Sequence, residues 1–151
     1  MNQNAKDVLK TAMSNVIEKF AFMFAEPDNA KVIPKVNGEI LYAEITFSGP
    51  RKGVIKVLAP QGFCMELAAN ILGIEKNETT SQAAEDALKE LINIVCGEVV
   101  AVLEGNKAVV NLSVPVIYMT DRSKWQELCA EEDSIMMTVE GMPVIANLII
   151  N

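Results

Sequence analysis

The 151-residue chain contains no histidine, and this absence excludes several kinds of active site. Without an imidazole there is no serine–histidine or cysteine–histidine catalysis and no histidine-ligated metal site. The three cysteines, Cys64, Cys96 and Cys129, are odd in number, far apart and outside any CxxC pair. They indicate neither a zinc site nor a disulfide framework, and the simplest interpretation is free, buried thiols in a reducing compartment.

Long apolar runs and excess positive charge are also missing. No uninterrupted apolar stretch approaches the roughly 18–20 residues that cross a bilayer, and the polar N-terminus has no signal-peptide core. We therefore expect a soluble, cytoplasmic protein without membrane insertion. The net charge of −7 and the pI of 4.6 argue against binding to nucleic acid or to an anionic membrane surface, because both attract basic proteins.

What the chain does have is a large apolar fraction, since 50% of its residues are hydrophobic. This composition predicts a single domain over residues 1–151 with a real core. Hydrophobic periodicity and turn residues divide the domain into helices and strands. In chain order we expect a helix over 5–26, a hairpin of strands 39–47 and 54–59, a short helix over 63–72, a long helix from a capping box at Thr79 and Gln82 to about 103, strands over 108–112 and 116–119, a partly helical insertion over 121–132, and a closing hairpin of strands 134–139 and 143–150.

The long helix carries a narrow polar stripe at positions i, i+4, i+7 and i+11, formed by Asp86, Glu90, Asn93 and Gly97. The opposite side of the helix reads as a core face, made of Ala84, Leu88, Leu91, Val95, Val99 and Val102. The stripe places a carboxylate one turn from a carboxamide, beside a glycine that allows close approach. It is therefore either a contact site that can hold a water molecule or the ordinary solvated face of an amphipathic helix.

The two halves of the chain, about 5–75 and 79–151, look alike. Each contains a long amphipathic helix followed by a hairpin, and the first helix repeats the spacing of the stripe at Ser14, Glu18, Ala21 and Ala25. We predict an α+β fold with a pseudo-twofold repeat, in which both hairpins share one antiparallel sheet and the helices pack on one side. The alternative is that helix–hairpin units are common and short patterns coincide.

The pattern D-xxx-E-xx-N, followed by Pro115 at 22 positions after Asn93, resembles the signature of the CheC/CheX/FliY family of chemotaxis phosphatases. Asp86, Glu90 and Asn93 match its helical positions, and the order of predicted elements is also similar to that family. The first helix keeps a glutamate, Glu18, but has alanine where the asparagine would stand. The chain is therefore more similar to the single-site CheX-like members than to the two-site CheC-like members.

The resemblance implies a substrate, which is the aspartyl-phosphate of a CheY-like response regulator. It also implies that Asn93 positions the attacking water and that Glu90 pairs with the active-site lysine of the receiver. An amide suits the first task because it donates and accepts hydrogen bonds without titrating. This chain would bind no cofactor, and magnesium is expected on the partner receiver.

The same resemblance implies supporting roles for the other stripe positions and for Pro115. Asp86 would cap nearby donors or extend an acidic rim, and Gly97 would keep the helix surface low at the contact. Glu18 could touch the partner without holding water, and Pro115 would fix a strand end. Arg51 and Lys52, in the first hairpin turn, are expected to be solvated turn residues.

Two other functions remain open from the sequence. The chain could be a non-enzymatic adaptor that binds a phosphorylated receiver or a partner of the flagellar-switch type. An enzyme of unrelated chemistry has no support from a glycine-rich phosphate loop, a metal-ligand cluster or a nucleophile–base pair. A homodimer is also possible, because the apolar strand 143–150 could present an unpaired edge.

Overall fold

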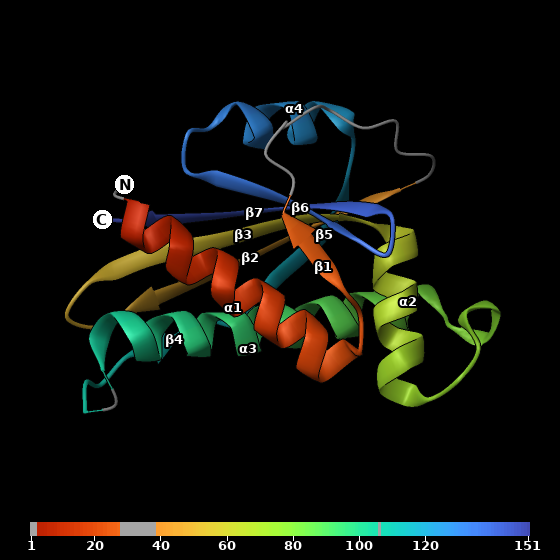
Figure 1. Cartoon of the computed structure of the whole chain (residues 1–151), viewed down its shortest axis with the longest axis horizontal. Coiled ribbons are helices and arrows are strands. Elements are labelled where there is room, and N and C mark those ends of the chain that lie inside the picture. Colours follow the sequence, from red (N-terminus) through yellow and green to blue (C-terminus); the bar gives the residue numbers. More distant parts are fainter. Residues whose placement is uncertain (1–2, 28–38, 106) are drawn as a thin grey trace.

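The computed structural model describes residues 3–27, 39–105 and 107–151. They form an antiparallel sheet of seven strands flanked by helices (Figure 1). In chain order the elements are α1 (Gln3–Ala21), β1 (Ala25–Pro27), β2 (Ile40–Ser48), β3 (Lys52–Pro60), α2 (Gln61–Leu72), the 3₁₀ turn η1 (Lys76–Glu78), α3 (Ser81–Glu104), β4 (Asn111–Leu112), β5 (Val116–Thr120), α4 (Arg122–Ala130), β6 (Ser134–Val139) and β7 (Met142–Ile150).

The sheet brings the two predicted hairpins together, with strand order β1-β6-β7-β3-β2 and with β4 and β5 both paired to β2. The hairpins β2–β3 and β6–β7 meet where β3 pairs with β7. On the outside, β1 of the first half pairs with β6, and β5 of the second half pairs with β2. Exchanging the halves leaves this order unchanged, which is the arrangement expected of a pseudo-twofold repeat.

Helices α1, α2 and α3 cover one face of the sheet, as predicted, and α4 lies over the opposite face (Figure 1). Side chains alternate along each strand, so β2 sends Leu41 and Ala43 to the three-helix side and Tyr42 to the α4 side. On that second side, Trp125 and Leu128 of α4 are fully buried. The polar insertion of the sequence thus covers the face of the sheet that the three larger helices leave open.

Helix α1 ends at Ala21, five residues before the predicted end at residue 26. Phe22 has a φ of 56°, in the left-handed region, and its N–H donates to the Glu18 carbonyl at 3.1 Å. The bond from Phe22 to Glu18 is that of the αL helix end, and the Met23 N–H donates further back, to the carbonyl of Ile17 at 3.3 Å. Ala25 therefore lies in β1 and not on the helix.

The early end of α1 also corrects the predicted copy of the polar stripe. Ala21 is fully buried, whereas Asn93, the residue it was matched with, is half-buried. Ala21 is further covered by α2, because the Asn70 side-chain amide donates to its carbonyl at 2.8 Å. Only Ser14 and Glu18 of the four-residue pattern stand on the accessible part of the helix, so α1 has no counterpart of the amide.

Two smaller expectations are also corrected. Strand β7 lies between β6 and β3, so the apolar strand 143–150 presents no free edge; among the described strands, the outer ones are β1, β4 and β5. An unpaired edge on this strand therefore cannot support a homodimer, and dimerisation itself stays a prediction. The N-cap of α3 is Thr80 and not Thr79, since the Thr80 hydroxyl accepts from the Ala83 N–H at 3.1 Å.

Candidate functional site

Helix α3 is the longest helix of the described structure and carries the predicted site. Its N-terminus is capped by Thr80, and its C-terminus is closed by Gly105, whose positive φ of 81° suits a glycine. Between these ends the buried residues recur at helical spacing against α1, α2 and the sheet. Of the expected core face only Val102, which is 68% exposed, lies outside the core.

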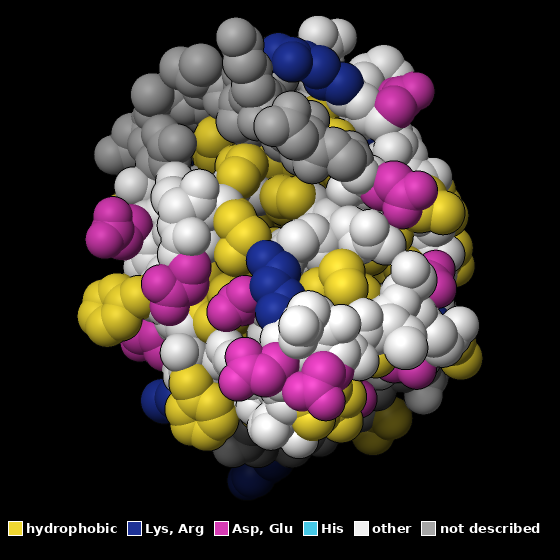
Figure 2. All heavy atoms as spheres, turned by 90° about the vertical axis from the view of Figure 1, so that its right-hand side faces the viewer, with side chains coloured by type: hydrophobic (Ala, Val, Ile, Leu, Met, Phe, Trp, Pro, Cys, Tyr) yellow, Lys and Arg dark blue, Asp and Glu magenta, His cyan; other side chains and the backbone are white. Residues whose placement is uncertain are grey.

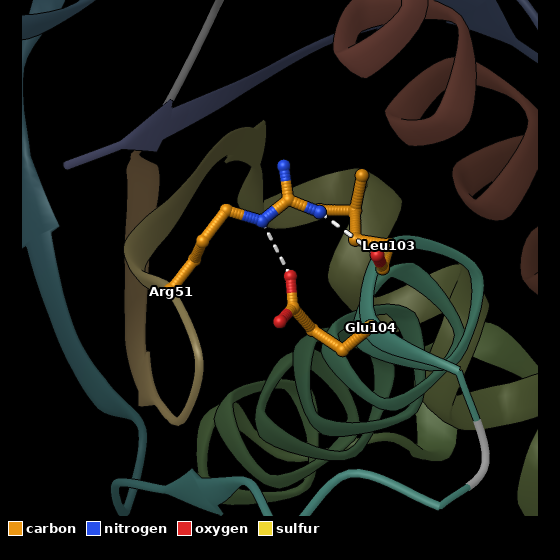
Figure 3. Close-up of polar contacts among 3 residues, drawn as sticks. All are labelled: Arg51, Leu103 and Glu104. Atoms are coloured by element: carbon orange, nitrogen blue, oxygen red, sulfur yellow. Dashed lines mark hydrogen bonds and ion pairs between the residues drawn. The ribbon is translucent and has the colours of Figure 1, made fainter.

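Arg51 fixes the C-terminal end of α3 from the β2–β3 turn (Figure 3). Its Nε donates to Glu104 Oε1 at 2.5 Å, and its guanidinium also donates to the carbonyl of Leu103 at 2.8 Å. The Glu104 side chain is 4% exposed and that of Arg51 is 45% exposed. Arg51 is thus a helix anchor and not merely a solvated turn residue; the contact spans 53 positions of the sequence, so no local pattern reveals it.

We expect Arg51→Ala to lower the free energy of unfolding by about 1–3 kcal/mol, because it leaves the buried Glu104 carboxylate without its partner. The loss should stay below that of a fully buried pair, since Arg51 is partly solvated. Urea denaturation measures the change, and Lys52→Ala, at the next position, where β3 begins, is the matched control. An unchanged midpoint for Arg51→Ala would show that the contact does not hold the helix end.

The four stripe residues lie on the accessible side of α3. Asp86, Glu90 and Gly97 are exposed, and Asn93 is half-buried beside them. The packed side is formed by fully or almost fully buried residues, among them Leu88, Leu91, Ile92 and Val95. The structure therefore brings the four residues together as the spacing predicts, with the amide closest to the body of the protein.

Two polar side chains of the stripe are left unused by the described part of the chain. Among the described residues, neither the Glu90 carboxylate nor the Asn93 amide has a side-chain hydrogen bond or ion pair. Asp86 differs, because its Oδ1 accepts from Gln82 Nε2 at 3.0 Å, one turn earlier on the helix. A carboxylate and an amide one turn apart are thus available to a bound molecule, one as an anion and the other as a donor and acceptor.

The glycine of the stripe leaves the helix surface open. A Cβ at Gly97 would have no other described atom within 4 Å. The packing of the described residues would therefore accept a side chain there, and the accessible face stays low beside Asn93.

The other predicted residues, Glu18 and Pro115, belong to other elements of the fold than the stripe. Glu18 is exposed on α1 and lines a separate, open depression with Phe22, Phe24 and Glu140. Pro115 is buried between β4 and β5, two residues after Ser113, whose N–H donates to the Thr46 carbonyl and whose hydroxyl accepts from the Thr46 N–H. Pro115 therefore fits a structural role, and the depression that Glu18 lines includes none of the four stripe residues.

The cysteines lie outside the site chemistry. Burial raises the pKa of Cys96 to about 12 and raises the pKa of Cys64 as well, so both thiols stay protonated and inert. Within the described part of the chain, no group of three or more acidic or cysteine side chains is placed to hold a metal ion. No described helix has both the length and the apolar character needed to cross a membrane.

Sequence reasoning missed one element of this surface. Asp86 and Glu90 also line a groove between α2 and α3, together with Ile71 and Leu72. The available signal was the apolar run at the end of the short helix, where both side chains remain exposed. In a sequence, a run of this kind indicates core residues, and only the packing of α2 on α3 shows that Ile71 and Leu72 line a groove instead.

Solved structures share this fold along nearly their whole length. A chemotaxis protein CheX from Desulfovibrio desulfuricans is 16% identical, with a TM-score of 0.72, over 98% of this chain and 99% of that one. A CheX–CheY–BeF3–Mg2+ complex from Borrelia burgdorferi matches with 16% identity and a TM-score of 0.68, over 96% of each chain. FliY from Thermotoga maritima matches with 14% identity and a TM-score of 0.58, over 99% and 91%.

The fold is thus that of the CheX and CheC-like chemotaxis proteins. The family model of the chemotaxis phosphatase CheX matches residues 41–140, which include α3 and Pro115. The chain belongs to the CheX family, and its general activity is that of a phosphatase. Among curated proteins, no sequence matches the chain.

Proposed function

We propose that this protein accelerates hydrolysis of the aspartyl-phosphate on a CheY-like response regulator. The observation that carries the proposal is a pair of side chains on the accessible face of α3, Glu90 and Asn93, which no described residue engages in a polar side-chain contact. Membership of the CheX family supports the reaction class, and the Borrelia complex, in which CheX is bound to CheY, supports the kind of partner.

In the proposed reaction, Asn93 holds a water molecule in line with the scissile bond. A new bond forms between the water oxygen and phosphorus, while the bond from phosphorus to the aspartate oxygen breaks, and inorganic phosphate leaves. The amide oxygen can accept from the water and the amide N–H₂ can donate to a phosphoryl oxygen, so one side chain fixes both reactants. Asn93 contributes positioning, and the charge on the phosphoryl oxygens is neutralised by magnesium on the receiver.

Glu90 would anchor α3 to the receiver by pairing with its active-site lysine. The helix is suited to a basic site, since its sequence holds five acidic residues and one lysine. Asp86, already oriented by Gln82, extends this negative edge. Gly97 lets the receiver backbone approach on the other side of Asn93. A contact from Glu18, which lies on α1, is a further prediction.

The test is phosphate release from a panel of purified CheY-like receivers, each phosphorylated with a small phosphodonor and mixed with the protein. We expect at least one receiver to lose phosphate faster by tenfold or more. Binding to a phosphorylated receiver without faster release would favour an adaptor, the function that the likeness to FliY leaves open. No binding and no acceleration across the panel would contradict the proposal.

A further inference from the structure

A groove of about 210 Å³ runs between α2 and α3, next to the polar stripe. Its floor is formed by three small side chains, Ala68, Ala83 and Ala87. Ile71 and Leu72 form its apolar wall, and they remain 39% and 58% exposed. Two carboxylates, Asp86 and Glu90, stand at its edge. The groove is therefore an apolar slot with an anionic rim.

The size of the groove indicates what it can hold. Pockets for small-molecule ligands usually measure about 300–1,000 Å³, so this one is small for a free ligand and is suited to a single side chain. Large apolar side chains left at the surface beside such a slot are typical of protein interaction sites. Figure 2, which looks onto the end of the molecule that carries α2, shows apolar and acidic side chains lying next to one another on this face.

The groove is continuous with the candidate active site, because Asp86 and Glu90 belong to both. A receiver that pairs with Glu90 must therefore cover the opening of the groove. The negative rim also selects what enters, since an apolar side chain flanked by a basic residue satisfies the slot and the rim together. An acidic neighbour would instead be repelled.

From this continuity and charge we propose that the groove binds one apolar side chain of the receiver, carried next to a lysine or arginine near the phosphorylated aspartate. The inference rests on the proposed function and adds to it a second contact, which selects the partner. The contact lies beside the reacting atoms and not on them. It should therefore change how tightly the receiver binds and not how fast bound phosphate is lost.

The first test removes the apolar wall with Leu72→Ser and measures phosphate release against receiver concentration. The half-saturating concentration is expected to rise about tenfold, while the rate at saturation stays within twofold of the wild type. Met119→Ser is the matched control, because Met119 is an apolar residue of similar exposure, 56% against 58%, on β5. It should leave both quantities unchanged.

A second variant, Ala83→Leu, fills the slot without removing the wall. It should also raise the half-saturating concentration, and thermal denaturation confirms that both variants are folded. If the wild type accelerates phosphate release but both variants match it at every receiver concentration, the groove has no partner and this inference is wrong. If the wild type itself has no effect on any receiver, the failure lies with the proposed function.

Discussion

Asn93→Ala is expected to reduce the accelerated loss of phosphate from a phosphorylated receiver by about 100-fold or more. Loss of the amide leaves the water without its orienting partner, and a misplaced reactant costs rates of that order. The receiver should bind with nearly unchanged affinity, because the main anchor, Glu90, is still present. Single-turnover phosphate release at saturating protein measures the chemical step directly.

The matched control for this experiment is Asn15→Ala. Asn15 is also a half-buried asparagine on a helix, but it lies on α1 and not on the polar stripe. It should retain the wild-type rate, whereas Asn93→Ala should bind the receiver and fail to speed phosphate loss. A fully active Asn93→Ala protein would remove the proposed role of the amide and leave only the binding function.

Glu90→Gln is expected to raise the half-saturating receiver concentration by about 30-fold, equivalent to about 2 kcal/mol of binding free energy. The substitution keeps the size of the side chain and removes its charge, so it isolates the pairing with the receiver lysine. The rate at saturation should fall much less than in Asn93→Ala, since the water-holding amide remains.

A charge-matched control is Glu127→Gln, which removes one negative charge from α4 on the opposite face of the sheet. Glu127 is the exposed partner of an ion pair with Lys124, at 3.6 Å, and its solvation keeps the contribution of the pair to stability small. If both variants weaken binding equally, the effect of Glu90 is a general one of net charge. If only Glu90→Gln lowers the affinity, and high salt reduces the difference, a direct ion pair is supported.

The parts of the fold that the sequence predicted are those with a clear period. The strands of both hairpins and the core face of α3 follow spacings of 2 and 3.6 residues, and the structure has them within a few positions. The polar stripe was predicted from the same helical spacing of 3.6 residues per turn. The D-xxx-E-xx-N pattern also predicted that these residues share one surface, because residues of one helix keep their spacing in space, and their role in the site stays a prediction.

What the sequence could not show depends on contacts between distant segments. The end of α1 lies within a run of apolar residues, where Phe22 takes a left-handed conformation that is usually left to glycine. The central place of β7 follows from strand order, which no local pattern contains. The anchor at Arg51 and the groove wall at Leu72 likewise arise only when α3 packs against other elements.

Gly97 has a consequence for the free protein that is separate from its place in the site. A glycine inside a helix weakens it by about 0.8–1.0 kcal/mol relative to alanine, and no described neighbour requires a glycine there. The unbound chain thus keeps a local weakness in its longest helix that its own described packing does not explain. On the proposed function, only binding of the receiver would offset the stability that the glycine costs. A larger residue at this position would therefore stabilise the helix but hinder the approach of the partner.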